Sequence, residues 1–361
     1  MKIIYRFYLK EILKYTLLAF FSLAVIYLLI DFFESLSYFV QYQASYLDIL
    51  FYYLYTFPSV ISLLLSPALI LAIFFVFGQA IRFNELRILK TMGIASQSLF
   101  KIPFFLSLLF FLFLFFNQEV IEIKGKISLE KLKKERIEKQ KRGADEKSKS
   151  NIYYLGENNV VYYIKELILP NIMKDFSLAL LDLKKGLKYR YDGKIAYYKN
   201  NKWIGYKVYF YDFLEGEHNF AYYDSLIFDF LKEKPEDLFA EMKEAEMMNF
   251  LELYSQIKKF RKAGFKMDKE MVNFHRRFAY PVIIIIVTIL SFGIVLHLKK
   301  GTVMLGLGIG LLISFLYWGF LQITYAMGEV NLLSPFWANW LPNIIFLIFG
   351  IITFLLTDKK F

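Results

Sequence analysis

The sequence predicts an α-helical integral membrane protein with six transmembrane helices and one inserted domain of antiparallel β-structure. Three observations predict this class. First, 57% of the 361 residues are hydrophobic and the mean hydropathy is +0.41, which is more than a soluble chain needs for its core. Second, the apolar residues gather in six long stretches. Third, the more polar segment 122–270 interrupts them with an alternating pattern.

Each apolar stretch is long enough to cross a bilayer, because a hydrocarbon core of about 30 Å requires about 20 mostly apolar residues. The stretches lie at about 12–33, 56–81, 102–121, 278–298, 302–327 and 335–357. The first is too long for a secretory signal peptide and lacks a small-residue cleavage site, so we expect a retained anchor. The domains are then helices 1 to 3 in 1–121, the inserted domain in 122–270, and helices 4 to 6 in 271–361.

Basic residues mark alternate connections between these stretches. The amino-terminal segment is basic, 34–55 contains no lysine or arginine, and 82–101 contains Arg82, Arg87, Lys90 and Lys101. The connection "HLKKG" is again basic, "GEVNLLSP" is not, and the tail ends in Lys359 and Lys360. The positive-inside rule therefore places both termini in the cytoplasm and 122–270 on the other side. In a bacterium this is a multi-pass inner-membrane protein with a periplasmic domain.

The basic run at 124–150 has two interpretations. It is either a solvated helical stalk with a flexible end or a cationic entry path for an anionic ligand. The net charge of +11 does not indicate nucleic-acid binding, since the excess outside the domain is mostly positive-inside bias. The absence of cysteine excludes disulfides in the external domain.

Residues 151–231 alternate between apolar and polar in short runs rich in tyrosine and phenylalanine, which predicts antiparallel strands in a sandwich or open barrel. We expect one hairpin to turn at Asp192-Gly193. Such a domain can hold an apolar ligand in a groove along its interior or add a partner strand at an edge, and aromatic density alone does not separate these from ordinary sheet core. A polar helix is expected at about 247–264.

The chain carries no recognisable catalytic motif. A phosphate-binding loop, an H-E-x-x-H motif and a cysteine nucleophile are all missing from the sequence. His218, His275 and His297 lie too far apart in the chain to suggest a local metal site. We therefore expect no catalytic residue, no metal and no cofactor. The glycines at 301–310 favour close helix packing, or alternatively a moving interface.

A short amphipathic segment, "RFNELRILKTMGIASQSLFK", interrupts the apolar sequence after the second stretch. Asn84 is the expected N-cap, Glu85 lies in the first turn, and Gly93 is the expected C′ residue. On a helical wheel one side carries Leu86, Ile88, Leu89 and Met92, and the other carries Arg87, Lys90 and Thr91. This helix either rests on the lipid surface or docks in a groove of a cytoplasmic partner that hydrolyses ATP.

Several segments together resemble the LptF/LptG permeases of the lipopolysaccharide-export ABC transporter. They are "YRFYLKEILKYTLLAF", "GQAIRFNELRILKTMGIASQSLFK", "NFHRRFAYPVIII" and "PFWANWLPNIIFLIFGI". The order of three helices, an external domain and three helices is also similar. The resemblance implies that the inserted domain is a periplasmic β-jellyroll. "IDFFESL" at 30–36 leans toward the LptG branch.

The resemblance also implies partners. These are an LptB-like ATPase dimer that binds ATP and magnesium, a paralogous LptF- or LptG-type permease, LptC- and LptA-like periplasmic proteins, and lipopolysaccharide. Residues 82–100 would be the coupling helix, with ATPase contacts at Glu85, Leu86, Arg87, Leu89, Lys90, Met92 and Gly93. Lipopolysaccharide would enter laterally and leave through the jellyroll toward the periplasmic bridge.

Family members hold the lipid phosphates with basic side chains at the cavity mouth. Here the first helix carries Asp31 and Glu34 near its outer end instead. The resemblance therefore shifts this role to other basic residues at the same membrane edge, namely Lys124, Lys126, Arg276 and Arg277.

Three other classes compete with the lipopolysaccharide permease. A chemiosmotic transporter would need ionisable groups within its spans, and few are present. A membrane-anchored periplasmic lipid receptor or scaffold would need only one or two helices. A permease of another ABC exporter would usually place its large external domain after the first helix. The lipid carried, the LptF or LptG identity and the partner permease stay open at this stage.

Overall fold

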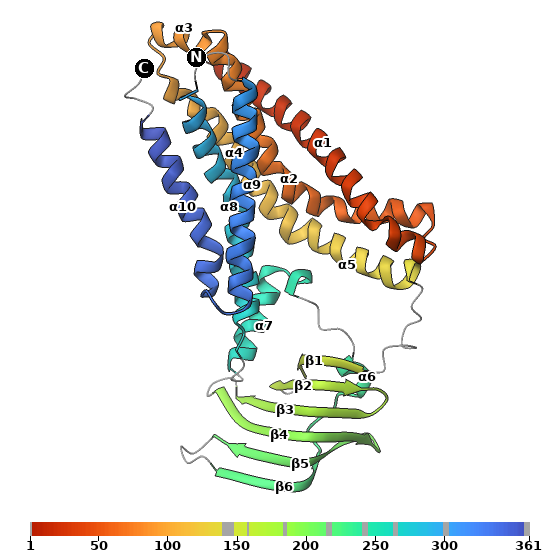
Figure 1. Ribbon diagram of the computed structural model, residues 1–361. Helices are drawn as coiled ribbons and strands as arrows, with labels where there is room; N and C mark the ends of the chain where they lie inside the picture. The colour runs from red at the N-terminus through yellow and green to blue at the C-terminus, as the bar shows by residue number, and fades with distance from the viewer. Residues whose placement is uncertain are drawn as a thin grey trace. The chain divides into compact units, whose positions relative to one another are not determined.

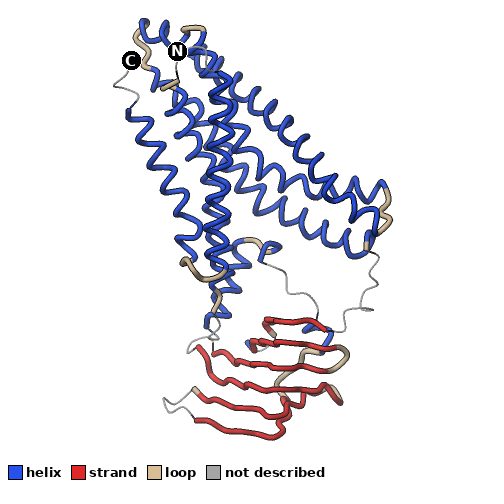
Figure 2. Tube along the Cα trace, viewed as in Figure 1, coloured by secondary structure: helices blue, strands red, loops and turns tan. Residues whose placement is uncertain are grey.

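The computed structural model describes residues 2–138, 148–156, 159–182, 186–213, 219–239, 245–262, 266–298 and 303–356. The chain divides into two compact units. A helical unit contains Met1–Glu138 and Asp268–Phe361, and a sheet unit contains Lys139–Met267. Residues 122–138 thus belong with the helices, although the sequence placed them in the inserted domain. Figure 2 distinguishes the helices of the first unit from the strands of the second.

The helical unit contains the six expected spans. Their helices are α1 (Lys2–Gln41), α2 (Tyr46–Arg82), α4 (Lys101–Phe116), α8 (Asp268–Val295), α9 (Val303–Glu329) and α10 (Pro335–Leu355), with the short α3 (Glu85–Thr91) and η1 (Ser96–Phe100) between α2 and α4 (Figure 1). By length and composition six helices of the described chain can cross a membrane. The prediction of six transmembrane helices is confirmed.

The central helices of this unit are α2 and α8. α2 packs against α1, α5 (Ile123–Leu132), α8 and α9, and α8 packs closely against α10. Most of the apolar window of α2 and of α8 is buried, whereas little of that of α1 and α9 is buried. Gly306 and Gly310 are buried and face Phe74 of α2, as close packing predicts, whereas Gly308 is exposed and a Cβ there would meet nothing within 4 Å. Gly301 lies outside the described residues.

The third span continues well beyond its apolar sequence. A π-helical turn η2 (Asn117–Glu122), α5 (Ile123–Leu132) and a second π-helical turn η3 (Lys133–Ile137) follow α4 directly. The stalk interpretation is right that this part is helical as far as Ile137 and wrong that solvent surrounds it. A Cβ at Gly125 would lie only 2.6 Å from the carbonyl oxygen of Tyr55, and Leu132 and Ile137 are buried against Phe39. These apolar contacts hold the segment against α1 and α2 instead of leaving it in solvent.

The sheet unit contains one six-stranded antiparallel sheet in the order β1-β2-β3-β4-β5-β6. The strands are β1 (Ser148–Leu155), β2 (Val160–Ile168), β3 (Ile172–Asp182), β4 (Gly186–Lys199), β5 (Lys202–Asp212) and β6 (Asn219–Phe228). The antiparallel prediction is confirmed. The described strands form an up-and-down meander, in which each strand pairs with its neighbour in the sequence. This order differs from the two-sheet sandwich that was one expectation. It also differs from the jellyroll that the resemblance implied, because a jellyroll interleaves its strands through Greek-key connections. α6 (Pro235–Phe239), η5 (Ala245–Met247) and α7 (Phe250–Lys262) follow, and α7 confirms the polar helix expected near 247–264.

The predicted hairpin turn at Asp192-Gly193 is wrong. Both residues lie within β4, where Asp192 is opposite Tyr209 of β5. Gly193 is needed there because a Cβ would lie 2.3 Å from the ring of Phe176. The turn between β4 and β5 is instead Asn200-Asn201, both with positive φ, as a primed two-residue turn requires.

Candidate functional site

The end of the helical unit that carries α3 is one candidate site. The start of α1, α3 and the end of α10 lie at this end (Figure 1). The hydroxyl of Tyr8 donates a hydrogen bond of 2.9 Å to Oε2 of Glu85, and the hydroxyl of Tyr5 donates one of 3.3 Å to the carbonyl of Ser98. The first helix therefore fixes the position of α3 and η1.

The two boundaries of α3 differ from each other in how well they were predicted. Asn84 is the N-cap residue, as predicted, since its carbonyl accepts from the amide of Ile88, but its φ is 63° and its side chain makes no capping hydrogen bond. The left-handed backbone at Asn84 redirects the chain out of α2 instead. Gly93 has φ of +81°, and the amides of Gly93 and Ile94 donate to the carbonyls of Lys90 and Leu89. This is a Schellman motif, which confirms Gly93 as the C′ residue.

The faces of α3 also differ from the predicted wheel. Leu86 is buried and Leu89 packs against the helical core, whereas Ile88 and Met92 are 56% and 69% exposed. Residues 86 and 89 are one helical turn apart, as are residues 88 and 92, so the four apolar side chains divide between two faces. Arg87, Lys90, Thr91 and Gly93 are exposed as well. The outward face of α3 thus combines cationic and apolar side chains.

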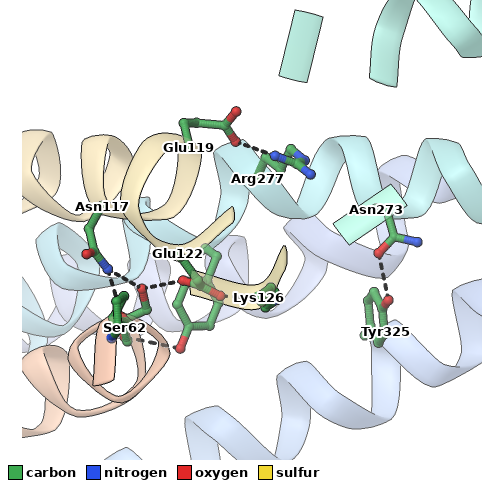
Figure 3. Close-up of polar contacts among 10 residues, drawn as sticks. Ser62, Asn117, Glu119, Glu122, Lys126, Asn273, Arg277 and Tyr325 are labelled. Carbon is green, nitrogen blue, oxygen red and sulfur yellow. Dashed lines mark hydrogen bonds and ion pairs between the residues drawn. The ribbon is translucent and has the colours of Figure 1, made fainter. Parts of the chain in front are cut away.

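A polar network lies within the helical unit at η2 (Figure 3). The amide nitrogen Nδ2 of Asn117 donates to the Pro58 carbonyl at 2.8 Å and to Ser62 Oγ at 3.0 Å. The Ser62 hydroxyl donates to Glu122 at 2.8 Å, and the hydroxyl of Tyr280 donates to the Ser62 carbonyl at 3.2 Å. The network joins α2, the π-helical turn and α8. The π-helical turn changes which side chains face α2, as such turns often do at functional positions.

A buried ion pair joins the third and fourth spans beside this network. Nη1 of Arg277 lies 2.8 Å from Oε1 of Glu119, and each side chain is only 7% exposed. The two residues come from η2 and α8 (Figure 3). The sequence offered a signal for this pair, because an ionisable residue inside an apolar span is costly without a partner. The partner itself is 158 positions away and could not be read from the sequence.

The four predicted lipid-binding cations have different surroundings. Arg277 is held by Glu119, and Lys126 pairs with Glu122 at 3.2 Å. Lys124 is exposed. Arg276 is half-buried, with its guanidinium 4.2 Å from the ring centroid of Tyr325.

Arg276 lines a pocket between α8, α9 and α10. The pocket also includes Tyr280, Trp318, Gln322 and Tyr325. The Tyr325 hydroxyl donates to Oδ1 of Asn273 at 2.9 Å (Figure 3), and this bond fixes the ring that lies against the Arg276 guanidinium. A cation among aromatic and amide side chains is suited to an anionic group attached to an apolar molecule.

The interior face of the sheet has a buried carboxyl group. Glu233 is 6% exposed and accepts a hydrogen bond from the hydroxyl of Tyr162. Burial, and then the hydrogen bond to Glu233, raise the pKa of Tyr162 above its ordinary value. The predicted apolar interior is present, but the chain's own residues, among them Leu231 and Leu238, fill it where a groove was expected. Sequence reasoning missed Glu233, which lies in a charged stretch and looks like a surface residue.

Among the described residues no group of three or more His, Cys, Asp or Glu side chains could hold a metal ion. His218 lies outside the described residues. The residues gathered at α3, at η2 and in the sheet can bind, dock and pack, and they include no nucleophile with a positioned base.

Comparison with known proteins adds the family. The family described as "Lipopolysaccharide export system permease LptF/LptG" matches residues 6–356, and this description covers both branches. No curated protein matches the chain. The match includes all six spans, the segment around α3 and the sheet unit. The chain therefore belongs to the LptF/LptG family and is a non-catalytic, multi-pass membrane subunit of a lipopolysaccharide export system.

Proposed function

We propose that this permease takes lipopolysaccharide from the inner membrane and passes it toward a periplasmic bridge, driven by an LptB-like ATPase dimer that docks on α3. It would act beside a paralogous LptF- or LptG-type permease and deliver the lipid to LptC- and LptA-like proteins. Both termini would be cytoplasmic and the sheet unit periplasmic, since the basic connections alternate as the positive-inside rule requires.

The observation that supports docking is the outward face of α3. Leu86 and Leu89 anchor the helix to the helical core, so they are not available to insert into lipid. The remaining face presents Arg87, Ile88 and Met92, a cation beside two exposed apolar side chains. Apolar anchors beside an arginine are the composition that protein interfaces favour at their centre. The chain has no phosphate-binding loop, so the energy must come from a partner that contacts it.

Glu85 has a role within this chain and not at the contact with the ATPase. Its carboxylate is bound by Tyr8, so its first role is to hold α3 in the orientation that presents Arg87 and Met92. Of the four candidate lipid cations, Lys124 and Arg276 stay in the proposal, since Arg277 and Lys126 are engaged with carboxylates within this chain.

Co-purification with the ATPase from detergent tests the docking. Arg87→Glu should insert and fold normally yet lose the ATPase, because a reversed charge in a partly desolvated contact costs on the order of 3 kcal/mol, or about a hundredfold in Kd. Lys10→Glu on the exposed side of α1 is the matched control for charge. Tyr8→Phe removes the hydrogen bond to Glu85 without changing charge, and Glu85→Lys should resemble it if Glu85 acts only within this chain.

The alternative is a passive lipid receptor or scaffold. Full retention of the ATPase and of lipid-stimulated hydrolysis in both Arg87→Glu and Met92→Asp would reject α3 as the docking site. Absence of any ATPase from the unmodified complex would favour the receptor.

A further inference from the structure

The interior face of the sheet is filled by residues that follow β6. Leu231 and Leu238 are 4% and 0% exposed and belong to the same buried cluster as Trp203, Tyr162 and Phe228. We call residues 229–239 the strap. Its apolar side chains occupy the interior that an acyl chain would need.

Hydrogen bonds from two strands converge on one residue of the strap. Tyr162 of β2 donates its hydroxyl to the carboxylate of Glu233, and Trp203 of β5 donates Nε1 to the Glu233 carbonyl at 2.9 Å. The amide of Lys232 donates to the same carboxylate at 3.1 Å. Tyr162 and Trp203 are fully buried, so these bonds are shielded from water.

The end of β1 is shaped for this carboxylate. A Cβ added at Gly156 would lie 2.1 Å from Oε1 of Glu233, a distance that no side chain tolerates. Glycine at 156 therefore permits the carboxylate to reach Tyr162. Tyr162 and Gly156 thus fit the side chain of Glu233, and Trp203 fits its backbone carbonyl.

A buried carboxylate adds little stability to the packing of an apolar face. Its hydration is lost on burial, and the hydrogen bonds that replace it only offset that loss. An apolar residue of similar size would hold the strap more firmly. Once the strap leaves the sheet, Glu233 regains water, which lowers the cost of displacement. The strap thus fits the sheet closely, but the free energy that favours its closed position is small.

We propose that the strap is a displaceable plug, closed over the interior of the sheet at rest and expelled when an acyl chain of the transported lipid takes its place. Leu231 and Leu238 stand where the methylene groups of that chain would lie. The hydrogen bond from Tyr162 to Glu233 breaks when the plug is displaced. This inference rests on the proposed function for the identity of the lipid.

A reversible lock tests the plug in the full chain within its complete transporter. The natural chain has no cysteine, so Gly156→Cys with Glu233→Cys introduces a single pair. The ideal Cβ at 156 lies 2.8 Å from the carboxyl carbon at the end of the Glu233 side chain, so the two positions are neighbours, and non-reducing electrophoresis verifies the disulfide before capture is measured. A photocrosslinking residue at Tyr191, which faces Phe230 of the strap, reports lipid in the interior.

Oxidation of this pair should reduce ATP-dependent capture of lipopolysaccharide at position 191 to the level without ATP, and reduction should restore it. The matched control is a cysteine pair at Tyr209 and Tyr222, which are opposite each other on β5 and β6 and away from the strap. That disulfide should leave capture unchanged. Equal capture by the oxidised and reduced 156–233 pair would overturn the plug.

A second measurement does not depend on transport. Leu238→Cys is buried at rest, and its labelling by a maleimide in the detergent-solubilised full chain should accelerate when purified lipopolysaccharide is added. Tyr162→Phe should raise the labelling rate about tenfold without lipid, since it removes a hydrogen bond to a charged group. An unchanged rate in both conditions would overturn the plug. If the reduced protein shows no ATP-dependent capture, the proposed export function is wrong. The labelling result alone would then test whether the strap is a displaceable plug.

Discussion

The Glu119–Arg277 ion pair should be one of the strongest single contacts between the third and fourth spans. Its atoms are 2.8 Å apart and each side chain is 7% exposed. With about 4 Å between charge centres and an effective dielectric constant of about 20, the attraction is about 4 kcal/mol. Arg277→Met would leave Glu119 with its charge buried and this attraction gone. We expect the free energy of unfolding to fall by about 3–5 kcal/mol.

The assay is reversible unfolding of the full chain in mixed detergent micelles, followed by circular dichroism. The control is Lys134→Met, which removes a pair with Glu130 whose side chains are 44% and 30% exposed. An exposed pair of this kind is worth about 0–1 kcal/mol. The double variant Glu119→Gln with Arg277→Met should lose less than the sum of the single variants, because neither charge is then left buried.

Two results would refute this reasoning. One is a loss for Arg277→Met no larger than for Lys134→Met. The other is strict additivity of the two single variants, which would mean that Glu119 and Arg277 do not stabilise each other.

Three further predictions concern other parts of the chain. Cysteine at Lys199 should react with an impermeant maleimide from outside the cell and cysteine at Arg87 should not, and the reverse pattern would reject the proposed orientation. Gly125→Ala should destabilise the helical unit by about 1–3 kcal/mol because its Cβ would meet the carbonyl of Tyr55, and an unchanged thermal midpoint would contradict this. The raised pKa of Tyr162 means that its contribution to stability is complete below the 10.0 of a free tyrosine and is lost as pH rises through the higher value. Tyr162→Phe should therefore lower the free energy of unfolding of the sheet unit at neutral pH and weaken its fall above pH 10.0, and an equally steep fall in the variant would oppose this reasoning.

Local patterns of sequence were sufficient for the number of spans and for the class of the inserted domain. Hydrophobic length depends only on neighbouring residues, and alternation over a few residues is enough to predict a strand. The end of α3 was also predictable, because Gly93 supplies the positive φ that a Schellman motif needs. At Asn84, by contrast, the preference for capping was overridden by the turn that separates α2 from α3.

Contacts between distant segments were decided only by the tertiary structure. Asp192-Gly193 has the local signature of a turn, yet the ring of Phe176 from the neighbouring strand occupies the space beside Gly193 and keeps the pair within β4. Arg277 is a second case in which local sequence misleads. Its sequence context suggests a free cation at a membrane edge, whereas the structure pairs it with Glu119. Sequence alone determined which segments are apolar, helical or extended, because those properties arise from residues close in the chain. Which charge is buried, and against which partner, depends on how helices and strands far apart in the sequence pack together.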